Sequence, residues 1–101
     1  MVCDVSNHVA PAFLSALCCH EIAGGPTRSK FLDEPCGILV VCWYCNGEQL
    51  EDKKLWPRSK QLALLNRVRP GWYDLDRFCN LAYGNTTAIT PQEVNEWVFP
   101  P

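Results

Sequence analysis

The sequence predicts a small α+β domain with a short antiparallel sheet and three to four short helices. An unbroken apolar run at residues 38–41 ends in a Cys42-x-x-Cys45 pair, which is typical of a buried strand that delivers two thiolates to a metal. Elsewhere, apolar residues recur at steps of three and four between turn residues, which is typical of amphipathic helices. The predicted domain is therefore α+β and stabilised by zinc.

The length and composition are those of one globular domain. A chain of 101 residues buries just enough surface to fold alone, and a metal or a partner often adds stability at this size. Its 48% hydrophobic and 20% charged residues exclude a disordered chain. No apolar run is long enough to span a bilayer, so no membrane partner is expected. We expect a single domain over 1–101, with a zinc-binding core at 11–84 and a C-terminal helix at 90–98.

The cysteine count indicates a reducing compartment. Seven cysteines cannot all be paired in internal disulfides. The apolar patch at 9–19 follows Asp4 and no Lys or Arg, and Pro11 interrupts it, whereas a secretory signal begins with positive charge. We therefore expect an intracellular protein.

The first half of the chain is predicted to hold a helix and a strand. Apolar residues recur at helical spacing over 11–22, which predicts a helix there. After a polar loop, the run at 38–41 is predicted as a strand, and Asn46-Gly47 behind the cysteine pair is typical of a hairpin turn. The charged and mixed stretch at 48–56 is expected to be extended.

Three further helices are predicted in the second half. Ser59 can cap a helix that runs to Val68, although a strand at 62–68 competes with it. Helical spacing predicts another helix at 75–83, which Gly84 ends. Residues 90–93, TPQE, form a capping box with proline in the first helical position, and they predict the C-terminal helix.

The spacing of the cysteines suggests a zinc site. A Cys-x-x-Cys pair can place two thiolates on one tetrahedral ion, and structural zinc needs four ligands. Downstream of the pair only Cys79 remains, and Asp76, which could ligate zinc through a carboxylate oxygen, stands three residues before it. The predicted ligands are Cys42, Cys45, Cys79 and Asp76. Alternatives for the fourth position are Cys36, His20, His8, Cys18 and Cys19, and the cysteines could instead be small buried hydrophobic residues without a metal.

Catalysis has little support in the sequence. His8 and His20 are the only histidines, and no nucleophile is paired with either by spacing. No glycine-rich phosphate loop is present. Asp74 and Asp76 would face apart on a helix, so we expect them to cap it rather than to form an acid–base pair. The protein is expected not to be an enzyme.

A basic segment is the candidate binding surface. Six of the nine basic residues lie between Lys53 and Arg69, with no acidic residue among them. This segment could follow the phosphates of a nucleic acid while its aromatic residues stack on bases. It could instead clamp an acidic amphipathic helix of a partner protein, or form a solvated face without a partner. The candidate binding residues are Lys53, Lys54, Trp56, Arg58, Leu62, Leu65, Arg67, Arg69 and Trp72.

An ordered series of motifs runs through residues 13–83. It comprises Leu17-Cys18, Val41-Cys42-x-x-Cys45, Leu50, Leu62-x-Leu64, Arg67 or Arg69, Gly71, and Cys79 followed by Asn80-Leu81. In order and spacing, the series resembles the zinc-binding domain of the papillomavirus early oncoprotein, the sixth early protein. The resemblance implies a zinc-bound domain without catalytic activity that binds a leucine-rich acidic helix of a host protein.

The chain departs from this family in two respects. Asp76 stands where the family has the first cysteine of its second pair, which makes the implied site one of three cysteines and one aspartate. The family usually grips its helix between two such domains, whereas this chain has the length of one. The groove would then have to be completed by the C-terminal helix at 91–98 or by a second copy.

A stretch of about fifteen residues that contains the CGIL, VV and YC elements at 36–45 is also similar to the adenovirus early-region-four adaptor that recruits a ubiquitin ligase. The two resemblances together imply a viral accessory protein that binds host proteins in the cytoplasm or the nucleus. A nucleic-acid-binding module and a metal-free interaction domain with buried thiols are the alternatives.

Overall fold

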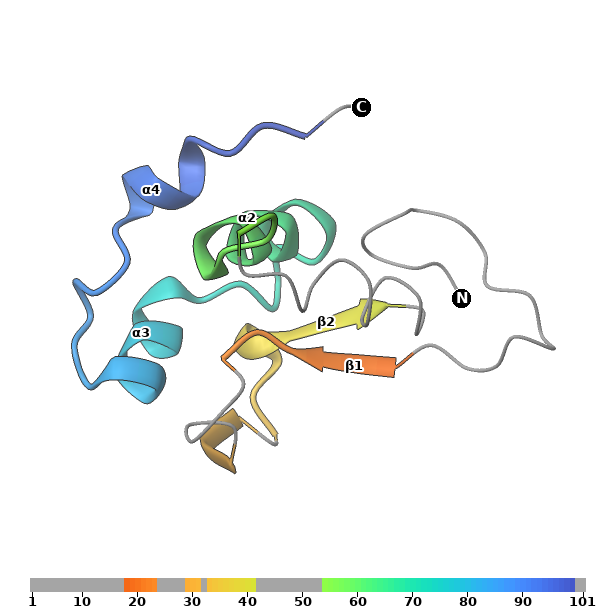
Figure 1. The fold of residues 1–101 in the computed structure, drawn as a ribbon. Coiled ribbons are helices and arrows are strands. Elements are labelled where there is room, and N and C mark those ends of the chain that lie inside the picture. The colour runs from red at the N-terminus through yellow and green to blue at the C-terminus, as the bar shows by residue number, and fades with distance from the viewer. Residues whose placement is uncertain (1–17, 24–28, 32, 42–53, 100–101) are drawn as a thin grey trace, which may run out of the picture.

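A computed structural model of the chain describes residues 18–23, 29–31, 33–41 and 54–99 (Figure 1). The described elements are strand β1 (Cys18–Glu21), 3-10 helix η3 (Pro35–Gly37), strand β2 (Ile38–Val41), and helices α2 (Arg58–Val68), α3 (Leu75–Tyr83) and α4 (Pro91–Asn95). They form a small α+β structure with one antiparallel sheet, as the sequence predicted.

The sheet consists of β1 and β2, and its second strand was predicted correctly. Cys18 lies opposite Val41, and Glu21 lies opposite Ile38. Beyond the strands, the Ile22 N–H donates to the Gly37 carbonyl at 2.8 Å. Along β2, Leu39 and Val41 are buried while Ile38 and Val40 are half-buried, so one face of the strand points into the core.

The helix predicted at 11–22 is wrong over β1, and residues 11–17 lie outside the described residues. In β1 and just after it, His20 and Ile22 point into the core while Cys19 is exposed, which is the two-residue period of a strand. An apolar strand such as β2 needs a neighbour for its backbone N–H and C=O groups. Residues 18–21 therefore form a strand that pairs with β2, although the spacing of the apolar side chains in this segment also fits a helix.

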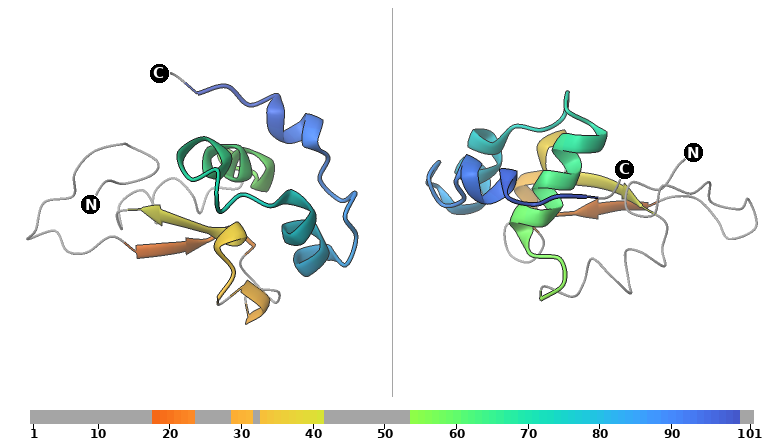
Figure 2. Two further views of the ribbon diagram at one scale, coloured as in Figure 1. Left: turned by 180° about the vertical axis from the view of Figure 1, so that it is seen from behind. Right: turned by 90° about the horizontal axis from the view of Figure 1, so that it is seen from above.

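Helix α2 is the central helix of the described structure. It contacts β2 on one side and α4 on another (Figure 1, Figure 2). Five consecutive residues, 61–65, are buried because neighbours cover more than one side of the helix. The helix at this position is confirmed and the competing strand is excluded, but Pro57 rather than Ser59 is the N-cap residue.

The signals at the ends of α3 were read correctly. Asp74 Oδ1 accepts a hydrogen bond from the Arg77 backbone N–H at 3.1 Å, which caps the N-terminus. Gly84 ends the helix in the left-handed conformation at φ 67°, and its N–H donates to the Asn80 carbonyl.

The C-terminal helix begins as predicted and ends earlier. Thr90 Oγ1 accepts from the Glu93 backbone N–H at 3.2 Å, and Pro91 occupies the first turn. The helix ends at Asn95 instead of residue 98. We call residues 96–99, which follow it, the tail.

Several predicted features lie outside the described residues, namely the Cys42-x-x-Cys45 pair, the hairpin turn at 46–47 and most of the extended segment at 48–56. The described end of that segment, residues 54–56, forms a turn. Among the helices that are described, none is long and apolar enough to cross a membrane.

Two aromatic rings join the segment before β2 to α3. Phe31 and Phe78 are fully buried, and their ring centroids lie 5.1 Å apart. Gly37 in η3 packs directly against this pair, because a Cβ atom at this position would lie 2.5 Å from Cδ1 of Phe31. A side chain here would have to displace a ring that is itself enclosed.

We therefore expect Gly37→Ala to lower the free energy of unfolding by about 1–3 kcal/mol through overpacking. Gly71→Ala is the matched control, since a Cβ atom at Gly71 would meet nothing within 4 Å. Chemical denaturation of both variants measures the difference. Equal stability of the two variants would contradict this packing.

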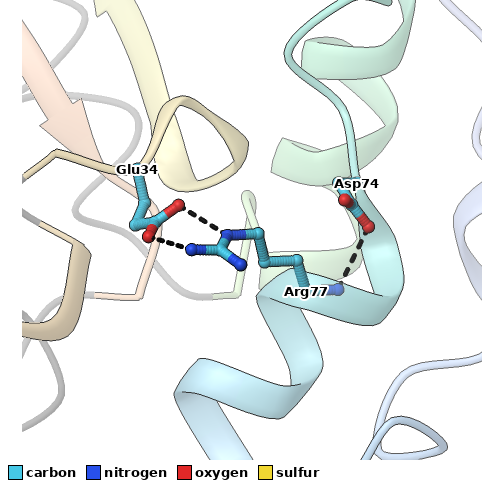
Figure 3. A network of polar contacts seen from close by, with 3 residues as sticks. All are labelled: Glu34, Asp74 and Arg77. Carbon is cyan, nitrogen blue, oxygen red and sulfur yellow. Dashed lines mark hydrogen bonds and ion pairs between the residues drawn. The ribbon is translucent and has the colours of Figure 1, made fainter.

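An ion pair also links the segment around η3 to α3 (Figure 3). Arg77 Nε donates to Glu34 Oε2 at 2.7 Å, and a second guanidinium nitrogen donates to Oε1, so the contact is bidentate. The hydrogen bonds from Arg77 hold the pKa of the Glu34 carboxyl below its ordinary value. The side chain of Glu34 is 21% exposed and that of Arg77 55%, so solvent weakens the contact.

Because its pKa is lower in the folded state, Glu34 stabilises the fold at neutral pH, and this contribution is lost as the pH falls through the folded-state pKa. We expect Glu34→Gln to cause a small fall in Tm at neutral pH that disappears in acid, where the wild-type carboxyl is protonated too. Thermal unfolding from neutral to acidic pH measures this, with Asp33→Asn as the control. A difference that persisted unchanged in acid would contradict an electrostatic role.

Candidate binding surface

A buried glutamine determines where α2 sits on the sheet. Gln61 is fully buried, and its Nε2 donates to the Trp56 carbonyl at 2.8 Å. Its Oε1 therefore faces His20 on β1, whose Nε2 lies 2.7 Å away and must carry the hydrogen. His20 is 6% exposed, so its hydrogen bond to Gln61 lies inside the core. The bridge connects the sheet, the turn before α2 and α2 itself.

We expect Gln61→Leu to lower the free energy of unfolding by about 1–3 kcal/mol, because the His20 N–H and the Trp56 carbonyl would lose their buried partner. A double-mutant cycle with His20→Phe measures the coupling. If the two substitutions were additive, the bridge would contribute nothing specific.

The outer side of α2 is a surface of basic and aromatic side chains. No acidic residue occurs in α2, and each of its basic residues, together with Arg69 at its C-cap, lies over an aromatic ring. The cation-to-ring distances are 5.3 Å for Arg58 on Tyr83, 4.2 Å for Lys60 on Trp56, 5.4 Å for Lys60 on Trp97, 5.9 Å for Arg67 on Phe99 and 4.7 Å for Arg69 on Trp72. These contacts gather around one helix and identify its outer side as the candidate binding surface.

Arg58 belongs to the framework of the fold. One guanidinium nitrogen donates to the Tyr83 hydroxyl at 2.7 Å, and the other donates to the Ala23 carbonyl. These bonds join the start of α2 to the end of α3 and to the segment after β1. Arg58, which was predicted as a binding residue, is thus held by internal contacts.

Three other predicted binding residues are in the core. Leu62 and Leu65 are fully buried, and Trp56 is only 9% exposed. The two leucines are not exposed as predicted, because the basic segment folds as a helix whose leucines face inward. Trp56 lies before the helix, with Lys60 over its ring and Phe99 stacked on it. Lys53 lies outside the described residues. Lys54 and Arg67 are exposed, Trp72 is 37% exposed, and Arg69 is half-buried.

The tail also contacts α2, although Trp97 and Phe99 were not among the predicted binding residues. Trp97 Nε1 donates to Ser59 Oγ at 3.0 Å, and the Phe99 ring stacks on Trp56 with centroids 6.2 Å apart and planes 20° from parallel. Val98 between them is 88% exposed. The signal that could have identified the tail is the aromatic-x-aromatic pattern directly after a short capped helix.

Two open hollows flank Trp97. The first has a volume of about 300 Å³ and lies between α2, α4 and the tail, with Ala63 and Val94 among its apolar lining and Asn66 and Arg67 among its polar lining. The second has a volume of about 360 Å³ and is lined by Ser59, Glu93, Glu96 and Trp97. Trp97 lines both hollows. The basic residue Arg67 borders the first hollow, and the acidic residues Glu93 and Glu96 border the second.

The described cysteines are mostly buried thiols. Cys79 is fully buried, its Sγ lies 3.6 Å from the Ile89 carbonyl, and burial, with help from nearby Asp76, raises the pKa of its thiol. Burial raises the pKa of the Cys36 thiol to about 11, whereas Cys19 is exposed.

Of the predicted zinc ligands, Cys79 and exposed Asp76 lie on α3, while Cys42 and Cys45 are outside the described residues. Within the described part of the chain, no three His, Cys, Asp or Glu side chains converge in a way that could hold a metal ion. The ligand set therefore stays a prediction.

No protein-family model matches the chain, and no curated protein or solved structure is significantly similar to it.

Proposed function

We propose that the protein is a non-catalytic adaptor of viral origin that binds a host protein through α2 and the tail. The observation that carries this proposal is that a helix without acidic residues holds its basic side chains against aromatic rings. Such a contact places a positive charge beside an aromatic ring at the surface, and carboxylates pair well with guanidinium groups. The exposed aromatic residues add apolar contact area, as at most protein interfaces.

The partner segment that suits this surface is an acidic amphipathic helix. Its carboxylates would face Lys60, Arg67 and Arg69, and its leucines would contact the tail. In the viral oncoprotein family that the chain resembles, a second domain closes the groove around such a helix. Here the tail beside α2 would supply that second wall.

A synthetic amphipathic peptide with leucines on one face and glutamates on the other should bind the full chain with an affinity that weakens as salt is raised. The same peptide with lysines in place of glutamates should not bind, because α2 would repel it. Fluorescence anisotropy measures both. Binding of the lysine peptide, or of neither peptide, would contradict the proposed function.

Nucleic acid is the second candidate. The Trp72 ring is partly exposed and lies beside Arg69, and an exposed aromatic ring next to a basic side chain can stack on a base. A single-stranded oligonucleotide in the same assay tests it. Tight binding that falls steeply with salt, together with no binding of the glutamate peptide, would favour this class.

We also propose that zinc stabilises the fold, with Cys42, Cys45, Cys79 and Asp76 as ligands. Three cysteines and one carboxylate would suit a closed tetrahedral structural site. In this arrangement Cys79 would exchange its contact with the Ile89 carbonyl for the metal. The intracellular setting implied by the odd cysteine count would keep the thiols reduced.

Protein purified under reducing conditions should contain one zinc ion per chain, and Cys42→Ala should lose both the metal and the folded state, since metal binding and folding are coupled in small zinc domains. Elemental analysis with circular dichroism measures both. Cys3→Ala, at a position that is in none of the candidate ligand sets, is the control. A metal-free protein that unfolds only at high temperature would contradict the zinc site and leave the binding surface untouched.

A further inference from the structure

We propose that Trp56 and the first turn of α2 form a recognition site for a segment of a partner protein with the pattern Trp-x-Phe, and that the tail of this chain occupies the site as an internal ligand. A partner that carries this pattern would bind by displacing the tail. The site is separate from the contact with an acidic helix proposed above, and either can fail without the other.

The tail is held by its two aromatic side chains. The Trp97 indole N–H donates to Ser59 Oγ at 3.0 Å, and the Phe99 ring stacks on Trp56 with planes 20° from parallel. Val98 between them is 88% exposed. This alternation matches an extended segment, in which side chains two residues apart lie on the same side. The site therefore reads two rings and leaves the middle position free to vary.

Different contacts select the two rings. Ser59 offers a hydroxyl acceptor, which an indole N–H can satisfy and a phenyl ring cannot. Lys60 Nζ lies 4.2 Å from the ring centroid of Trp56 and 5.4 Å from that of Trp97, so one ammonium group contacts a ring of the site and a ring of the ligand. The core fixes the stacking surface for the second ring, because Trp56 is 9% exposed and its carbonyl accepts from buried Gln61.

The tail can leave this site without unfolding the domain. Trp97 is 38% exposed and Phe99 is half-buried, whereas Val94 in α4 is 1% exposed and belongs to the core. A segment held by few buried contacts opens at a small fraction of the free energy that global unfolding requires. A second segment with the same pattern therefore competes with the tail for one site.

A capped peptide with the sequence of residues 95–99, NEWVF, tests this competition on the full chain. A tail that fills the site about nine-tenths of the time lowers the apparent affinity for a competing segment about tenfold. We therefore expect Trp97→Ala to bind the peptide about tenfold more tightly than wild type. Val98→Ala, at the exposed middle position of the tail, is the matched control and should bind like wild type.

Backbone amide NMR signals of the isotope-labelled protein measure the affinity and report whether residues around Ser59 respond. Circular dichroism verifies that each variant is folded. Adding Ser59→Ala to Trp97→Ala should weaken binding of NEWVF about fivefold, through the loss of one hydrogen bond. Ser29→Ala, at an exposed serine that also lies between an arginine and a lysine, should leave binding unchanged.

The peptide NEWFV tests the pattern, because it has the same composition but places its two rings on adjacent residues. It should bind Trp97→Ala at least tenfold more weakly than NEWVF does. Equal affinity of the two peptides, or equal affinity of wild type and Trp97→Ala for NEWVF, would overturn the site and leave the acidic helix to its own test. Dimerisation of the wild-type chain that Trp97→Ala abolishes, measured by sedimentation, would overturn a separate partner and assign the site to the tail of a second copy.

Discussion

The buried amide of Gln61 is the contact on which the rest of the described structure depends. A side chain this polar is stable in a core only when its donors and acceptors are paired. Gln61 finds one partner on β1 and the other in the turn before α2, so it joins segments that lie 41 residues apart in the chain. Because these bonds are directional, they select one position and one rotation of α2, which apolar packing alone would not do.

That rotation decides which residues of the basic segment reach the solvent. With Gln61 inward, Leu62 and Leu65 turn into the core and the basic side chains turn toward the tail and α3. The tail completes the surface because Trp97 and Phe99 alternate along it and both contact the α2 region. One helix therefore supplies the core with leucines and the surface with cations.

Local signals could be read from the sequence, and long-range ones could not. The strand at 38–41 and the caps at Gly84 and Thr90 depend on neighbouring residues, so they were predicted correctly. The strand β1 depends on pairing with a distant segment, and its own side chains also fit a helix. Which residues of the basic segment face inward depends on how α2 packs, which no local pattern reveals, whereas the aromatic-x-aromatic pattern of Trp97 and Phe99 is a local signal that was not used.

The central claim is that the surface formed by α2 and the tail is where a partner binds. Side-chain NMR of the tryptophan indole N–H groups during titration with the leucine–glutamate peptide tests it most directly, because the Trp97 indole donates to Ser59 near the start of α2 and Trp97 lines both hollows, whereas Trp72 follows the C-terminal end of α2. We expect a large, saturable shift of the Trp97 signal and a smaller one for Trp72. Saturable shifts confined to Trp72, with Trp97 unchanged, would contradict it.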